Sequence, residues 1–219
     1  MEDAQRGESS SASEVLLEAR EVIKAFGGHR AVSGLTFTLK RGAITGLIGP
    51  NGAGKTTLFN CLSGALKPDG GRITLAGHDI TGAAPGRIFA AGLARTFQIP
   101  RPFPALSVLE NVMLAPRGQL GERPWSNWLR PAAVAAEERR TREAARHWLD
   151  FVGLSRLAEQ PARVLSGGQR KLLELARVMV AQPQLVLLDE PGAGVNPALL
   201  EQIVQMIARL NREQGVSFL

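Results

Sequence analysis

The sequence has little cysteine, no tyrosine and no long apolar run, and these shortages exclude whole classes of protein. Only Cys61 among the 219 residues carries a thiol, so no disulfide can form within the chain and a reducing compartment is favoured. No stretch reaches the roughly 18 uninterrupted apolar residues of a membrane-spanning helix. Residues 1–13 are polar and serine-rich, without the apolar core of a secretory signal, so we expect a disordered tail there.

The remaining composition is that of a globular protein. Hydrophobic residues make up 44% of the chain, which is enough to bury a core in one domain, or in one domain with a subdomain. The formal net charge of +6 would suit nucleic acid, an anionic membrane surface or an anionic ligand, and charge alone does not choose among them. Cys61 lies in an apolar run, so we expect a buried thiol and not a nucleophile.

Residues 49–57, GPNGAGKTT, match the phosphate-loop pattern G-x-x-x-x-G-K-[ST]. Residues 43–48 before the loop predict a short buried strand, and residues 58–62 after it predict a helix. Glycines allow the loop to direct consecutive N–H groups at an anion, and the helix start adds its positive dipole end. Lys55 would reach the β- and γ-phosphates, and the Thr56 hydroxyl would bind Mg²⁺. The alternative is a glycine-rich turn with a solvated lysine.

Alternation of strand and helix patterns around this loop predicts a mostly parallel α/β core. From residue 104 to about 182 the pattern is helical, which predicts an inserted helical block that includes a capping box at Ser107 and Glu110 and a proline-interrupted loop with Trp125 and Trp128. The strands are expected at 15–25, 31–39 (joined by a hairpin turn at 26–29), 72–77, 93–98, 185–188 and 216–219, and the main helices at 132–152, 168–181 and 197–213.

Four arginines on the long helix could form a nucleic-acid patch: Arg139, Arg140, Arg142 and Arg146. Three glutamates are interleaved with them, however, and Glu138 stands four residues before Arg142, a favourable ion-pair spacing on a helix. The charge pattern therefore favours a solvated helix face over a nucleic-acid surface.

Two carboxylates, Asp189 and Glu190, follow the apolar strand at 185–188. A carboxylate at the end of a strand, close to a phosphate loop on a neighbouring strand, suits a second contact to Mg²⁺. Glu190 could then act as general base toward a water in line with the γ-phosphate. The alternative is an acidic strand end that caps the following helix.

The segment Leu165-Ser166-Gly167-Gly168-Gln169 offers a second anion site, since it combines two glycines, a hydroxyl and a helix start. A chain that holds one nucleotide in its phosphate loop has no obvious need of another. We therefore expect this loop to close over the nucleotide of a partner chain.

These motifs in this order, GPNGAGKTT, Gln98, LSGGQ and LLDEP, resemble the ATP-binding subunit of an ABC transporter, and the resemblance extends from residue 15 to residue 219. It implies a P-loop NTPase core of the ABC type, with a mostly parallel sheet, an antiparallel β subdomain and an inserted α-helical subdomain at about 104–182. It also implies a head-to-tail dimer that holds two ATP molecules with Mg²⁺. Closure of that dimer would drive two transmembrane subunits between their inward- and outward-facing states.

The resemblance also implies a role for each matching residue. Phe26 would stack on adenine, and the chain has no tyrosine that could do so instead. Gln98 would contact Mg²⁺ and the attacking water, Asp189 would bind the metal with Thr56, and Glu190 would be the catalytic base. The residues implied in nucleotide binding are Phe26, Gly49, Asn51, Gly52, Gly54, Lys55, Thr56 and Thr57 and, toward the partner's nucleotide, Ser166, Gly168 and Gln169.

Several segments resemble the uptake branch for branched-chain and other hydrophobic amino acids. They are Phe26-Gly27-Gly28, Arg95-Thr96-Phe97-Gln98, the Trp-containing insertion and the GxNP ending at residues 194–197. This implies a cytoplasmic, peripheral subunit on the inner face of the cell membrane. Its implied partners are a second ATP-binding subunit, identical or not, transmembrane permease subunits and an extracytoplasmic solute-binding protein, with no direct contact to nucleic acid.

Two other functions remain open at this point. A non-transport ABC ATPase could act on DNA or the ribosome, although such relatives carry a long coiled coil between the motif halves or two cassettes in one chain. A regulatory module that binds nucleotide without turnover is the third possibility.

The family pattern places a switch histidine shortly after the strand that begins near Val216, and this chain stops at Leu219. His29, His78 and His147 stand elsewhere in the order and do not replace it. We therefore expect residues 14–219 to form the ABC domain with its C-terminal end missing, and such a chain to bind ATP with impaired turnover.

Overall fold

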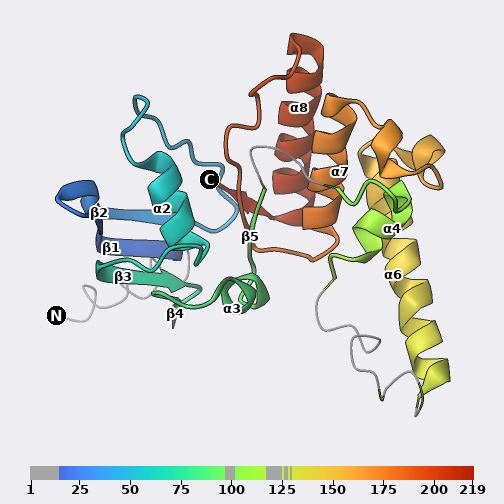
Figure 1. The fold of residues 1–219 in the computed structure, drawn as a ribbon, viewed down its shortest axis with the longest axis horizontal. Helices are drawn as coiled ribbons and strands as arrows, with labels where there is room; N and C mark the ends of the chain where they lie inside the picture. The colour runs from blue at the N-terminus through green and yellow to red at the C-terminus, as the bar shows by residue number, and fades with distance from the viewer. Residues whose placement is uncertain (1–14, 97–101, 117–124, 126–127, 129) are drawn as a thin grey trace, which may run out of the picture. The chain divides into compact units, whose positions relative to one another are not determined.

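The computed structural model describes residues 15–96, 102–116, 125, 128 and 130–219 (Figure 1). These residues fall into two compact units. The first unit comprises the chain up to Arg95 together with residues 183–189 and 207–219, and the second comprises residues 96–182 and 190–206.

The first unit contains a four-stranded antiparallel sheet in the order β2-β1-β3-β4 (Figure 1). A two-residue turn, Gly27-Gly28, joins β1 to β2, and the φ of Gly27 is 58°, a left-handed value that glycine adopts without a steric penalty. The predicted hairpin is therefore confirmed. The strands are β1 (Val15–Phe26), β2 (His29–Lys40), β3 (Gly70–Leu75) and β4 (His78–Asp79).

A parallel sheet in the order β5-β6-β7 completes this unit, formed by β5 (Leu93–Arg95), β6 (Leu185–Leu187) and β7 (Ser217–Phe218). All three residues of β6 are buried, and a parallel partner lies on each side. The run of apolar residues at 185–188 predicted this, because a central parallel strand is covered on both faces.

The predicted buried strand at 43–48 is wrong. Backbone pairing is confined to one bridge, Ile44 to Phe218, and the side chains of Ile44 and Ile48 are 54% and 95% exposed. An apolar, β-branched run becomes a strand only where a neighbour supplies hydrogen-bond partners. Strand β7 spans two residues and supplies them for one bridge.

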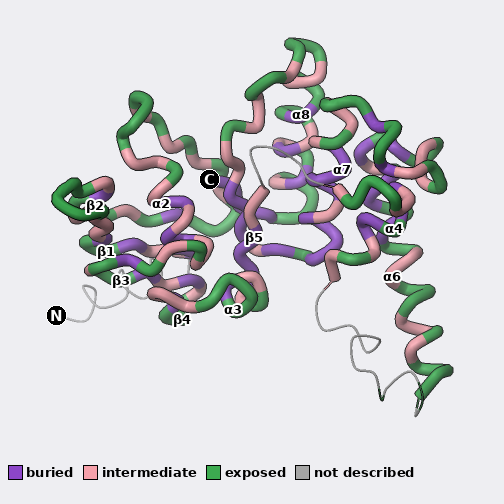
Figure 2. The backbone as a smooth tube through the Cα atoms, in the orientation of Figure 1, coloured by how far each residue is buried: buried purple, intermediate pink, exposed green. Residues whose placement is uncertain are grey.

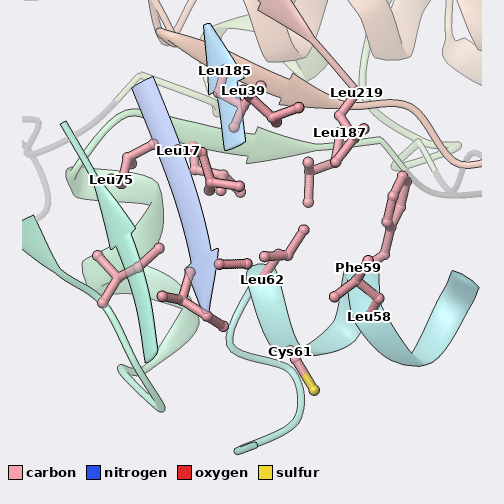
Figure 3. Packing of buried hydrophobic residues seen from close by; sticks show 14 of the residues in the cluster. Leu17, Leu39, Leu58, Phe59, Cys61, Leu62, Leu75, Leu185, Leu187 and Leu219 are labelled. Carbon is pink, nitrogen blue, oxygen red and sulfur yellow. The ribbon is translucent and has the colours of Figure 1, made fainter. Parts of the chain in front are cut away.

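Helix α2 (Lys55–Leu62) follows the phosphate loop and packs into the core of the first unit. Figure 3 shows Leu58, Phe59 and Leu62 of this helix among the leucines of the two sheets, with Leu17 and Leu187 nearby. The helix that carries the loop is therefore anchored by burial on its inner face. The short helix α3 (Pro85–Ala90) and strand β4 were not predicted.

The second unit is helical. Its capping box at Ser107 and Glu110, predicted from the sequence, is present at the start of α4. Helix α6 buries Ala145, Trp148 and Leu149 in its second half, while its first half is largely exposed (Figure 2). The elements are α4 (Val108–Met113), α6 (Pro131–Phe151), α7 (Gly167–Met179), the first part of α8 (Pro197–Gln214) and the 3₁₀ turns Ser155–Leu157 and Ala162–Val164.

The arginines of α6 lie on a solvated face, as predicted. Arg142 pairs with Glu138 at 3.4 Å, and the two side chains are 44% and 59% exposed. No helix in the described part of the chain combines the length and apolarity that crossing a bilayer requires.

The single thiol gives a direct test of this packing. Cys61 is 1% exposed, and burial raises the pKa of its thiol, which lowers the thiolate fraction at a given pH. We expect Cys61 in the native protein to react with Ellman's reagent at pH 8 at least about tenfold more slowly than in concentrated urea. Equal rates in the two states would contradict the packing of α2.

Candidate functional site

The phosphate loop takes a conformation that glycine favours. Gly52 and Gly54 both have φ values of 83°, which a side chain disfavours. The Lys55 ammonium donates to the carbonyl oxygens of Gly49 at 2.6 Å and Pro50 at 2.9 Å. Lys55 therefore lies along the inside of the loop and brings a positive charge to the place where phosphates are expected.

Gly54 has a second reason to be glycine. A Cβ at this position would lie 2.0 Å from the carbonyl oxygen of Ala31 on β2, far inside van der Waals contact. Glycine at position 54 therefore lets the chain pass this close to β2 just before α2 starts.

The first turn of α2 is open to an anion. Leu58 donates the first helical hydrogen bond, to the Gly54 carbonyl at 2.8 Å, so the N–H groups of Lys55, Thr56 and Thr57 have no acceptor within the helix. There is no side-chain cap and no acidic residue in the first turn. These N–H groups and the helix dipole suit a phosphate.

A recess of about 360 Å³ lies beside the loop, bounded by the start of β2 and by loop residues that include Ile48, Gly54 and Lys55. Phe26 ends β1 with its side chain 51% exposed. Its ring is therefore available for stacking, and the Lys24 ammonium lies 5.6 Å from the ring centroid.

Asp189 follows β6, as predicted, and its carboxylate Oδ2 accepts a hydrogen bond from Arg95 Nη2 at 2.8 Å. The prediction that the phosphate loop lies on the strand next to this one is wrong. Strand β7 intervenes, because Phe218 bridges to Ile44 on one side and pairs with Val186 on the other.

The oxygen donors of the first unit fit a magnesium ion. A Thr56 hydroxyl and an Asp189 carboxylate are hard ligands, and Mg²⁺ is commonly held by one or two such groups together with nucleotide phosphates. Among the described residues no cluster of three or more His, Cys, Asp or Glu side chains could hold a metal alone. Gln98, the other predicted metal contact, lies outside the described residues.

The LSGGQ segment begins helix α7 with a capping box. Ser166 Oγ accepts from the Gln169 N–H at 3.2 Å, and Gln169 Oε1 accepts from the Ser166 N–H at 2.9 Å. A Cβ on Gly168 would lie 2.1 Å from Leu199 Cδ2 at the start of α8. Glycine at 168 therefore lets the two helix starts approach within the second unit.

Glu190 lies in the segment between β6 and α8 and begins a turn, in which the Ala193 N–H donates to its carbonyl oxygen at 3.0 Å. Its φ is 48°, a value that costs a residue with a side chain about 1 kcal/mol or more. Asn196 Oδ1 accepts from the Leu199 N–H at 2.8 Å and so provides the side-chain cap of α8. The alternative interpretation of Asp189 and Glu190 as the cap of this helix is therefore wrong.

Sequence reasoning missed Lys171. Its ammonium donates to the carbonyl oxygens of Pro191 at 3.1 Å and Ala193 at 2.5 Å. Burial lowers the pKa of Lys171. This lysine ties α7, which carries the LSGGQ segment, to the turn that follows Glu190. The feature of the sequence that could have identified Lys171 is its position two residues after LSGGQ.

The predicted site residues thus separate into two groups. The first unit holds Phe26, residues 49–57 and Asp189, whereas the second holds Ser166, Gly168, Gln169 and Glu190. Each group contains one helix start suited to an anion, at α2 and at α7.

Comparison with known proteins gives consistent results. Residues 32–193 match the family model described as ABC transporter. The chain is 38% identical over 93% of its length to the high-affinity branched-chain amino acid transport ATP-binding protein BraF of Pseudomonas aeruginosa, covering 80% of that protein. It is 41% identical over 93% of its length to the probable branched-chain amino acid transport ATP-binding protein LivG of Archaeoglobus fulgidus, covering 78% of it.

Comparison with solved structures indicates the same family as these relatives. A nucleotide-free ATP-binding cassette from an ABC transporter superposes with a TM-score of 0.78 at 36% identity, over 93% of this chain and 79% of that one. The ADP conformation of an ATP-binding cassette of an ABC transporter gives 0.77 at 34% identity, over 93% and 79%. The predicted fold class is confirmed.

The close approach at Gly54 can be tested by substitution. We expect Gly54→Ala to weaken ATP binding roughly tenfold or more, or about 1.4 kcal/mol, because the loop must move away from Ala31. Gly86→Ala is the matched control, since a Cβ at Gly86 meets nothing within 4 Å. Equilibrium binding of a fluorescent ATP analogue measures both. Affinity retained in Gly54→Ala would contradict this geometry.

Proposed function

Because this chain belongs to the ABC transporter family, whose ATP-binding domains are ATPases, we propose that it energises an importer of branched-chain or other hydrophobic amino acids. The observation that carries the proposal is its 36–41% identity, over more than nine-tenths of its length, to ATP-binding proteins named for branched-chain amino acid transport. The GxNP ending and the Arg95–Gln98 segment support the same branch.

Nucleotide binding is assigned to the first unit. Phe26 stacks on the adenine, the N–H groups of the loop bind the β- and γ-phosphates, and Lys55 turns from the loop carbonyls toward the phosphates. Thr56, an exposed residue, would supply its hydroxyl and Asp189 its carboxylate to hold Mg²⁺. The metal, when bound, neutralises charge that develops on the phosphates.

Hydrolysis is assigned to Glu190 and Gln98. Glu190 accepts a proton from the attacking water as general base, and Gln98 orients that water. Lys171 supports Glu190 indirectly, because its two hydrogen bonds fix the turn that begins at this residue.

The second anion site requires a partner. Ser166, Gly168 and Gln169 belong to the helical unit, which we propose as the inserted subdomain, and they complete the nucleotide site of a second ATP-binding subunit. ATP binding then closes the dimer, and hydrolysis opens it. Permease subunits in the membrane would convert this motion into transport, and an extracytoplasmic solute-binding protein would deliver the amino acid. The chain would be peripheral on the inner face of the membrane.

Amino-acid uptake tests the function in the source cell. In a strain that lacks this chain, its gene should restore uptake of radiolabelled leucine. We expect Lys55→Ala to abolish that uptake, because the lysine charge at the phosphates is lost. Lys67→Ala, in the turn after α2, is the matched control and should support uptake.

The same strain distinguishes the alternatives. A tagged chain purified from detergent-solubilised membranes should carry permease subunits, identified by mass spectrometry. Normal leucine uptake without the chain, or recovery of ribosomes or DNA-bound proteins in place of permeases, would contradict the proposal.

Dimer formation is a separate prediction. We expect Glu190→Gln to shift from monomer to dimer when ATP and Mg²⁺ are added, because ATP is bound and not consumed. Light scattering measures the mass, and the double variant Glu190→Gln with Ser166→Arg should stay monomeric, since a bulky cation replaces the hydroxyl at the shared site. A Glu190→Gln chain that never dimerises would contradict the shared site.

A further inference from the structure

Arg95 contacts both parts of the proposed nucleotide site in the first unit, namely helix α2, which follows the phosphate loop, and Asp189. It ends β5 opposite Leu187 of β6, in parallel register, so it lies beside the strand end that leads to Asp189. Its guanidinium donates from Nη2 to Asp189 Oδ2 at 2.8 Å. The two side chains are 15% and 14% exposed, so this ion pair is shielded from water.

The other side of the guanidinium is held by helix α2. Arg95 Nη1 donates to Asn60 Oδ1 at 2.6 Å and to Ser63 Oγ at 3.3 Å. Its Cζ lies 5.8 Å from the centroid of the Phe59 ring. Arg95 therefore connects the carboxylate after β6 to the helix that begins at the phosphate loop.

This arrangement has a local cost. Arg95 Nε is buried and has no hydrogen-bond partner among the described residues, and an unsatisfied buried donor costs about 1–3 kcal/mol. The contacts at Nη1 and Nη2 hold the guanidinium in place despite that cost. A planar fork with donors on two edges can do this, whereas the ammonium of a lysine cannot reach both partners in the same geometry.

These contacts of Arg95 determine which oxygen of Asp189 stays available. Its Oδ2 is occupied by Arg95, while its Oδ1 makes no hydrogen bond within the described part of the chain. A shielded carboxylate without a counter-charge is strongly unfavourable, and the charge-assisted bond both compensates it and fixes its rotamer. One oxygen is thereby left for a cation or its bound water.

We propose that Arg95 is a positioning residue that holds Asp189 in the orientation in which its second oxygen serves Mg²⁺. The inference rests on the proposed role of Asp189 in metal binding. Arg95 also repels the cation, but a fixed ligand outweighs that repulsion, since loss of a hydrogen-bond partner behind a metal ligand typically lowers metal affinity about 10- to 100-fold.

The test measures the affinity for a fluorescent ATP analogue with Mg²⁺ and with EDTA, in chains that also carry Glu190→Gln so that no turnover occurs. The ratio of the two affinities is the gain due to the metal. We expect Arg95→Gln to reduce this gain about tenfold, and to leave the metal-free affinity within about twofold. Arg95→Lys should lie between, because it keeps the charge and loses the fork.

Two further variants separate the loss of Asp189 orientation from a general loss of folding. Asn60→Ala removes the second anchor of the guanidinium and keeps its charge, so it should also reduce the gain. Arg87→Gln, at an exposed arginine of α3, is the matched control and should leave the gain unchanged. Circular dichroism monitors the fold of each variant, and Asn60→Ala tests the inference if Arg95→Gln does not fold.

The outcomes distinguish this inference from its premise. Asp189→Asn must reduce the gain; a gain that Asp189→Asn leaves intact would overturn the metal role of Asp189 and the inference with it. A gain that falls in Asp189→Asn but is unchanged or larger in Arg95→Gln and Asn60→Ala would overturn the role of Arg95 alone.

Discussion

The contact between Gly54 and the Ala31 carbonyl is the constraint on which the nucleotide site depends. Because glycine has no Cβ, the loop can lie this close to β2 at the residue before α2 begins. Burial of Leu58, Phe59 and Leu62 then holds that helix in the core. Burial of α2 thus anchors the end of the loop that joins this helix, which lowers the ordering cost of binding a ligand there.

Polar side chains then connect this rigid helix to the strand ends. Arg95 joins α2 to Asp189, and in the second unit Lys171 joins α7 to the turn after Glu190. In both cases a long basic side chain fixes a segment that carries a carboxylate. The two carboxylates are adjacent in sequence, yet the basic residue that contacts each segment belongs to the same unit as that segment.

The sequence predicted those features that neighbouring residues decide. The hairpin at Gly27-Gly28, the capping box at Ser107 and the central strand β6 are confirmed, since turn chemistry, cap spacing and an apolar run are local signals. The strand expected at 43–48 does not form, because its hydrogen-bond partners come from a segment distant in sequence. Arg95 was missed as a positioning residue for the same reason, since 94 positions separate it from Asp189. Local pattern does not encode such a contact.

The cap of helix α7 bears on why a serine stands at position 166. Aspartate and asparagine cap helices as well as serine does, so the hydrogen bond to Gln169 does not by itself require a hydroxyl. A hydroxyl oxygen accepts that bond through a lone pair and keeps its own proton to donate. An ionised aspartate has no proton to give and would repel a phosphate. Serine can therefore cap the start of the helix and donate its proton to an anion at the same time, and neither task displaces the other.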